Sequence, residues 1–130
     1  MELVIIDDTE IPNQEILYRR IPPEQMKFEG GQWRVSTGAF TTRQASVNLA
    51  SRISPEEILG SYPTHSLVSF TASNIRELGC LLAKETGDTD PSHFLVCREG
   101  DLNQRISKTI ATNLIKKVSW VRFNPPQSTT

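Results

Sequence analysis

The chain has 130 residues, which fits one compact domain and leaves little room for a second. Hydrophobic residues make up 37% and charged residues 22%, the composition of a globular protein rather than a disordered one. The net charge of -1 argues against a nucleic-acid coat or a membrane-surface protein. No apolar run approaches the roughly 18 residues that span a bilayer, and the amino terminus has neither a positive start nor a signal cleavage site. We therefore expect a cytoplasmic protein that does not contact a membrane.

Short apolar runs predict the β-strands, and turn residues bound most of them. The runs are residues 3–6, 15–21, 67–70, 93–97 and 119–123, with weaker candidates at 39–40 and 47–49. Residues 26–35 alternate apolar and polar side chains around Gly30-Gly31. Because glycine adopts the positive φ that a tight turn needs, this pattern predicts a β-hairpin.

Two short helices are predicted from their amino-terminal caps. Ser54-Pro55-Glu56-Glu57 has a serine cap, a proline at the first helical position and a glutamate at the third, which is a capping box. Gly60 is expected to end this helix early. Ser73 is expected to cap the second helix, and Gly79 to end it in a left-handed conformation. Residues 80–83 fit either an extension of that helix or a strand.

The longest helix is expected to begin at Asp101, with Gln104 completing a second capping box. Its apolar stripe consists of Leu102, Ile106, Ile110 and Leu114. The basic residues on its opposite side are Arg105, Lys108 and Lys116. Together these elements predict a single α+β domain over residues 1–123, with an antiparallel or mixed sheet and two or three covering helices. Residues 124–130 are expected to form a flexible polar tail.

Metal ligands and nucleophilic thiols are few in this sequence. Cys80, Cys97, His65 and His93 are the candidates, and no pair has the spacing of a zinc finger, so we expect no metal site. Cys97 and His93 are four residues apart on one predicted strand, which separates them by about 13 Å and excludes a direct hydrogen bond. Two cysteines cannot form a disulfide framework, so we expect buried thiols in a reducing compartment.

An arginine pair on one predicted strand is followed by a Ser-Thr pair after the predicted hairpin. Tyr18-Arg19-Arg20-Ile21 is followed by Gly30-Gly31-Gln32-Trp33 and by Ser36-Thr37-Gly38-Ala39-Phe40. These segments resemble the start of RES-domain toxins, within the wider group of ADP-ribosyltransferase-like proteins. The resemblance implies an NAD-using enzyme or a degenerate relative, with Arg20, Ser36 and Glu99 in its site. Strand register decides whether Arg19 or Arg20 faces inward, because neighbours on a strand face opposite ways.

A second resemblance covers residues 18–96. Its segments are an Arg-Arg-x-Pro start at 19–23, residues 33–40 with a Ser-x-x-Ala-Phe pattern, Ser46-Val47, residues 70–72 and 76–79, and residues 90–93 with a Pro-x-His pattern. This order resembles a loose group of short uncharacterised bacterial proteins, which often lie near mobile-element or conflict-system genes. The resemblance implies a place in such a system and transfers no catalytic residue.

Charge divides between the two ends of the chain. The acidic residues Glu2, Asp7, Asp8, Glu10 and Glu15 precede the first basic residue, and no acidic residue follows Asp101. With no complete catalytic constellation, this division favours a small non-catalytic protein-binding module, an accessory subunit of a bacterial multi-component system. Its partner-binding residues are expected to be Arg105, Lys108, Lys116 and Trp33. Nucleic-acid binding through the basic carboxy-terminal helix is the third hypothesis, and the oligomeric state is left open.

Overall fold

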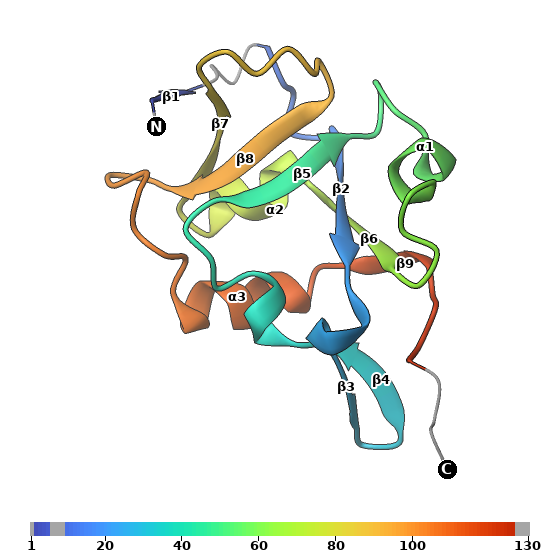
Figure 1. The fold of residues 1–130 in the computed structure, drawn as a ribbon. Coiled ribbons are helices and arrows are strands. Elements are labelled where there is room, and N and C mark those ends of the chain that lie inside the picture. The colour runs from blue at the N-terminus through green and yellow to red at the C-terminus, as the bar shows by residue number, and fades with distance from the viewer. Residues whose placement is uncertain (1, 6–9, 127–130) are drawn as a thin grey trace.

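The computed structural model describes residues 2–5 and 10–126 of the chain. Asp7 and Asp8, in the acidic segment, and Ile6, at the end of the first predicted strand, lie outside the described residues. Within the described ranges, nine strands and three α-helices form an α+β domain, and seven of the strands make one antiparallel sheet (Figure 1). This architecture confirms the predicted fold class.

The large sheet has the strand order β1-β7-β8-β5-β2-β6-β9, so β1 and β9 are its edges. In this order the strands are β1 (Leu3–Ile5), β7 (Cys80–Glu85), β8 (His93–Arg98), β5 (Ala45–Leu49), β2 (Ile16–Ile21), β6 (Ser66–Thr71) and β9 (Ser119–Arg122). The hairpin of β3 (Met26–Glu29) and β4 (Gln32–Val35) projects from the body of the domain (Figure 1). Its turn residues Gly30 and Gly31 have φ of 61° and 81°, as the Gly-Gly pair predicts.

The two short helices begin with side-chain caps. At α1 (Pro55–Leu59), Ser54 and Glu57 form the predicted capping box. At α2 (Ala72–Glu77) the cap is Thr71 rather than Ser73, because the Thr71 hydroxyl accepts from the Asn74 N–H at 3.1 Å. The expected cap position was wrong by two residues. After Gly79, residues 80–83 continue as strand β7.

The long carboxy-terminal helix begins later than expected. Ser107, not Asp101, caps α3 (Lys108–Ile115), and Arg105 lies in the preceding loop. The Asp101 side chain instead accepts from the Asn103 N–H, which makes a local turn. Residues 39–40, a weak strand candidate, lie at the end of the 3₁₀ turn η2 (Thr37–Ala39).

The two faces of the large sheet differ in what covers them. On one face the main core packs against α2, α3 and η2, and it includes Leu17, Val47, Phe70, Val96 and Leu114. On the other face, α1 covers Leu67 and Tyr18. A separate group around Leu95 and Cys97 covers the β7–β8 end of that second face. Between these two small clusters, polar side chains of β5 and β8 are left uncovered.

The segment after β9 is attached to the body of the domain at Asn124. The Asn124 N–H donates to the Ser66 hydroxyl at 2.8 Å, and the Asn124 amide donates to the Pro63 carbonyl at 2.9 Å. Residues 127–130 of the predicted tail lie outside the described residues. In the part of the chain that the structure describes, no helix is long and apolar enough to cross a membrane.

Candidate active site

Ser46 and His93 meet on the uncovered part of the sheet's second face. Asn48 on β5 lies opposite His93 on β8, and Ser46 lies two residues before Asn48, so strand alternation places all three side chains on one face. The Ser46 hydroxyl oxygen is 2.8 Å from the His93 Nε2. A hydroxyl and an imidazole from different strands therefore form a direct hydrogen bond.

Asp88 extends this contact into a relay of three groups. The His93 Nδ1 lies 2.7 Å from the Asp88 Oδ2. The hydrogen bond from His93 lowers the pKa of Asp88, and bonds from the Asp90 N–H and the charge of Lys84 act in the same direction. Because an ionised carboxylate only accepts, a neutral His93 donates from Nδ1 and leaves Nε2 to accept the Ser46 proton. The order Ser46–His93–Asp88 is that of a nucleophile, a base and an orienting carboxylate.

The loop that carries Asp88 is held in place from both sides. Gly87 has a φ of 95°, and the Asp88 Oδ1 accepts from the Asp90 N–H at 2.9 Å. The Lys84 ammonium donates to the carbonyls of Asp90 and His93 at 2.8 and 2.5 Å and lies 3.6 Å from the Asp88 Oδ2. Lys84 therefore ties the loop to the start of β8.

The relay is sheltered at its carboxylate end and open at its hydroxyl end. The Asp88 side chain is 16% exposed and that of His93 is 29% exposed, whereas Ser46 is classed among the exposed residues. An open pocket lined by Glu85, Thr86, Gly87, Asp88 and His93 lies at the carboxylate and imidazole end of the relay, and Ser46 is not among its lining residues. Because Ser46 is itself exposed, a ligand can reach the hydroxyl from solvent.

Arg19 lies beside Ser46, at the point where β2 and β5 stop pairing. Its side chain is on the core face of β2, which settles the register question: Arg19 faces inward and Arg20 faces the second face. The Arg19 Nε donates to the Ala39 carbonyl at 2.9 Å, and the Nη1 donates to the Ser46 carbonyl at 2.8 Å. Burial, and then repulsion from Arg20, lower the pKa of Arg19 to about 10, so the group stays charged at neutral pH.

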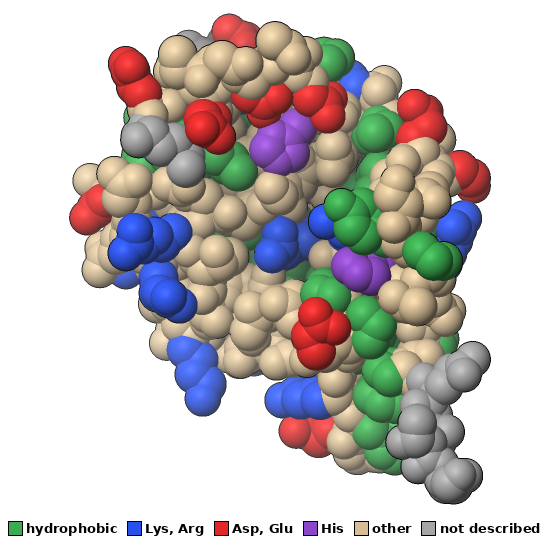
Figure 2. Space-filling model, viewed as in Figure 1, with side chains coloured by type: hydrophobic (Ala, Val, Ile, Leu, Met, Phe, Trp, Pro, Cys, Tyr) green, Lys and Arg blue, Asp and Glu red, His purple; other side chains and the backbone are tan. Residues whose placement is uncertain are grey.

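Arg20 is held on the second face by aromatic stacking. Its guanidinium carbon lies 3.6 Å from the centre of the Tyr62 ring, and Tyr62 packs against His65 with ring centres 4.9 Å apart. Figure 2 shows both histidines on one face of the molecule, with a basic side chain between them and acidic side chains beside one of them. Arg20, Ser46 and His93 therefore contribute to one polar surface.

The residues proposed for an NAD site have separate environments. Arg20 stacks on Tyr62, the Ser36 hydroxyl accepts from the Gly38 N–H at 3.3 Å, and Glu99 lies in the turn after β8. Among the described residues, no hydrogen bond, ion pair or ring contact joins any two of the three. A dinucleotide site made from them stays a prediction that this arrangement does not favour.

The residues expected to bind a partner are accessible. Arg105, Lys108 and Lys116 are exposed, although Arg105 precedes α3 and is not part of a helix. Trp33 is half-buried on β4, with its ring 5.4 Å from that of the exposed Phe28. The prediction that all three basic residues share one helix face is therefore wrong for Arg105.

The two cysteines are buried free thiols, as predicted. Leu81 lies opposite Cys97 in the β7–β8 ladder, so Cys80 and Cys97 occupy opposite faces of the sheet. Burial raises the pKa of each thiol to about 11, which keeps both protonated at neutral pH. Within the described ranges, no group of three or more His, Cys, Asp or Glu side chains is arranged to hold a metal ion.

The Ser46–His93–Asp88 relay was missed from the sequence. From the sequence, His93 is a candidate metal ligand and a candidate partner for Cys97, and Ser46 belongs only to a resemblance. The signal was present in those resembling segments, because Arg19, Ala39, Ser46 and His93 come from four of them and now form one contact network. Asp88, in a Gly-Asp turn five residues before His93, completes that network.

No protein-family model, curated protein or solved structure matches this chain. Both resemblances stated from the sequence therefore stay predictions.

Proposed function

We propose that this chain is an enzyme in which Ser46 is the nucleophile, His93 the general base and acid, and Asp88 the group that orients His93. The observation that carries the proposal is the unbroken chain of contacts from the Ser46 hydroxyl to the Asp88 carboxylate, at 2.8 and 2.7 Å. Each distance lies within hydrogen-bond reach, which is the first requirement for proton transfer.

The relay supports transfer of an acyl or phosphoryl group from an ester to Ser46. His93 takes the hydroxyl proton as the oxygen attacks, and then gives it to the leaving oxygen. Water can release the transferred group with His93 again acting as the base. The proposed activity is therefore hydrolysis of an ester through a covalent intermediate on Ser46.

A serine that serves only the fold is the alternative explanation of this network. Asn48 and Ser92 provide an example close by, because the Asn48 amide donates to the hydroxyl of Ser92, a residue 2% exposed, at 3.0 Å. The Ser46 hydroxyl differs from that of Ser92 because it faces solvent. An exposed hydroxyl with a sheltered base behind it favours chemistry over support.

Covalent labelling with a fluorophosphonate probe tests the nucleophile. We expect the probe to label Ser46, Ser46→Ala to abolish labelling, and His93→Gln to slow it by about 10²–10⁴-fold, which is the usual contribution of a general base. Peptide mass spectrometry locates the label, and stopped time courses give the rate constant.

The chain offers matched controls for both substitutions. His65→Gln changes the other histidine, and Ser119→Ala removes an exposed strand hydroxyl on β9. Both variants should be labelled at the wild-type rate. Equal labelling of His93→Gln and wild type would contradict the proposed role of His93.

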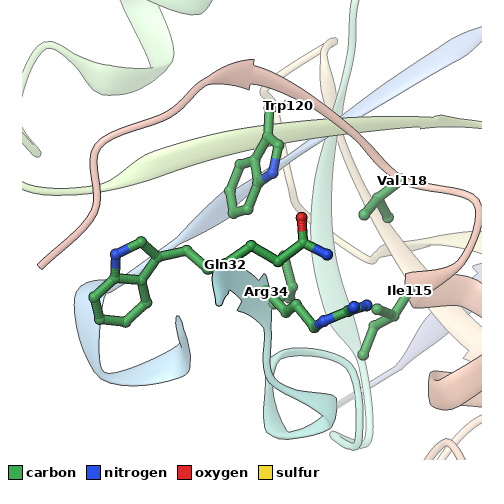
Figure 3. A pocket seen from close by; sticks show the side chains of 7 residues that line it. Gln32, Arg34, Ile115, Val118 and Trp120 are labelled. Atoms are coloured by element: carbon green, nitrogen blue, oxygen red, sulfur yellow. The ribbon is translucent and has the colours of Figure 1, made fainter. Parts of the chain in front are cut away.

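A second candidate function, a protein-binding module, is favoured by an exposed aromatic surface. The β3–β4 hairpin, the end of α3 and β9 surround a pocket lined by Trp33, Arg34, Ile115, Val118 and Trp120, together with Gln32 and Val35. Figure 3 shows side chains from these elements converging on it. Trp120 and Phe123 nearby are 38% and 48% exposed. Aromatic side chains of this kind are enriched at protein interfaces.

Basic residues beside this pocket favour an acidic protein partner. Lys27, Arg34 and Lys116 line an adjoining pocket, together with Glu29, which pairs with Lys27 at 3.4 Å and leaves two of the three cations in excess. Charge complementarity of this kind steers association and suppresses wrong partners. An accessory subunit of a bacterial multi-component system would use the surface in this way.

Affinity capture of the binding partner from the native host tests this second candidate. We expect Lys116→Glu to lower the amount captured by about tenfold, while the melting temperature stays unchanged. Arg43→Glu, which makes the same charge change at another exposed position, is the control. Equal capture by wild type and Lys116→Glu would remove this surface from consideration.

A further inference from the structure

Two arginines of β2 lie on opposite sides of the sheet near Ser46: Arg19 binds the Ser46 carbonyl from the core side, and Arg20 is on the second face, as the Ser46 hydroxyl is. Leu49 donates its N–H to the Ser92 carbonyl at 2.8 Å, so strand alternation turns the N–H and C=O of Ser46 away from β8 and toward β2. Pairing between β2 and β5 ends at Tyr18 and Asn48. Arg19 then takes the Ser46 carbonyl in place of a strand partner.

Arg20 lies on the second face, on the same side of the sheet as the Ser46 side chain. Tyr18 lies opposite Asn48, and Arg20 and Ser46 are each two residues further toward the same end of the strand pair. Their side chains therefore point to one side of the sheet. Stacking on Tyr62 occupies the flat face of the guanidinium and leaves its in-plane N–H groups available to a ligand.

Neither guanidinium is neutralised by the described residues. Within residues 2–5 and 10–126, no ion pair joins Arg19 or Arg20 to a carboxylate, and no hydrogen bond engages Arg20. Asp88, the nearest acid in the relay, is already occupied by His93 and Lys84. The fold also keeps the half-buried Arg19 charged, although burial lowers its pKa. Arg20 is therefore a cation on the face of the nucleophile with no carboxylate partner among these residues, and its N–H groups suit an anionic ligand.

We propose that the substrate is a phosphate ester, whose non-bridging oxygens Arg20 binds while Ser46 attacks the phosphorus. This inference rests on the proposed function. Guanidinium groups match phosphate geometry, and in phosphoryl transfer the negative charge is spread over several oxygens that cations can hold. In acyl transfer, the negative charge of the transition state is concentrated on one carbonyl oxygen, which is usually stabilised by two N–H groups that donate hydrogen bonds to it.

The reaction balances in atoms and charge, and water is the only reactant that it needs besides the phosphate ester. A bond forms between the Ser46 oxygen and phosphorus as the bond from phosphorus to the leaving alcohol breaks. The Ser46 proton passes to the His93 Nε2 and then to the alcohol oxygen. Water attacks the phosphoserine, gives its proton to His93, and releases phosphate, and His93 returns that proton to the Ser46 oxygen.

Orthovanadate, which forms a five-coordinate adduct with hydroxyl nucleophiles, is the probe. We expect it to protect Ser46 from fluorophosphonate labelling in the wild type. Arg20→Gln should weaken vanadate binding by about tenfold or more, because a charge-assisted hydrogen bond is lost. Arg43→Gln is the matched arginine control.

The outcomes separate this inference from the function on which it rests. Turnover of p-nitrophenyl phosphate or its bis-ester, together with vanadate protection that Arg20→Gln weakens, supports a phosphate ester. Labelling of Ser46 without vanadate protection, or turnover of p-nitrophenyl acetate alone, overturns the phosphate inference and leaves the nucleophile in place. Vanadate protection that Arg20→Gln leaves unchanged overturns the role of Arg20. Absence of any Ser46 labelling overturns the proposed function itself.

Discussion

Asp88→Asn should lower the rate of Ser46 labelling by about 10³–10⁴-fold while the chain stays folded. The Asp88 Oδ1 accepts from the Asp90 N–H at 2.9 Å, and an asparagine oxygen can keep that bond. The new NH₂ group then faces the His93 Nδ1 and donates to it. His93 must in turn carry its proton on Nε2, where it can no longer accept the Ser46 proton. Labelling kinetics and the thermal unfolding curve, measured on the same preparation, check both parts of this prediction.

Asp90→Asn is the matched control for this change. It places the same substitution in the same loop, where the Asp90 Oδ1 accepts from the N–H and the hydroxyl of Ser92 at 2.9 and 2.8 Å. An asparagine oxygen can keep these two bonds, so we expect near wild-type labelling. A rate for Asp88→Asn that equals the rate for Asp90→Asn would show that Asp88 only shapes the loop.

Phe40→Ala should lower the free energy of unfolding by about 3–5 kcal/mol. Phe40 is 1% exposed, and its ring meets that of Phe70 edge-on with centres 5.7 Å apart. The Arg19 guanidinium lies 5.5 Å from the same ring centre. Truncation therefore leaves a cavity in the core and removes the support under Arg19. Urea unfolding followed by tryptophan fluorescence measures the change.

Phe28→Ala is the control for the loss of an aromatic ring. Phe28 is 63% exposed on the hairpin and contacts Trp33, so we expect its removal to change stability by less than about 1 kcal/mol. Should Phe40→Ala fail to fold, Phe40→Leu keeps most of the volume and should cost about 1–2 kcal/mol. Equal midpoints for Phe28→Ala and Phe40→Ala would contradict the assigned core.

Local patterns predicted the elements whose cause is local. The Gly-Gly turn of the hairpin and the capping box of α1 involve residues within four positions of one another, and both are present. The start of α3 was misplaced because Asp101 and Ser107 are both good caps. Ile106 is 1% exposed and its N–H donates to the Thr42 carbonyl at 3.0 Å. This tertiary contact keeps Ile106 outside the helix, although its local pattern favours a helical position.

The candidate site depended on contacts that no local pattern contains. Ser46 and His93 are 47 positions apart, and Arg19 and Ser46 are 27 apart. Their proximity follows from the strand order, which sets β5 between β8 and β2. The register then decides that the side chains of Ser46 and His93 share a face, because a slip of one residue would reverse every side chain on the strand.

By itself, the sequence determined an α+β chain with buried thiols, a glycine hairpin and strands that begin and end close to their apolar runs. These features follow from backbone preferences and from the burial of apolar side chains, both of which act over a few residues. Only the tertiary structure decided that Arg19 faces inward, that Arg20 stacks on Tyr62, and that Ser46 reaches His93. Those contacts form where strands distant along the chain pair in one register, and the pairing depends on the packing of the whole domain.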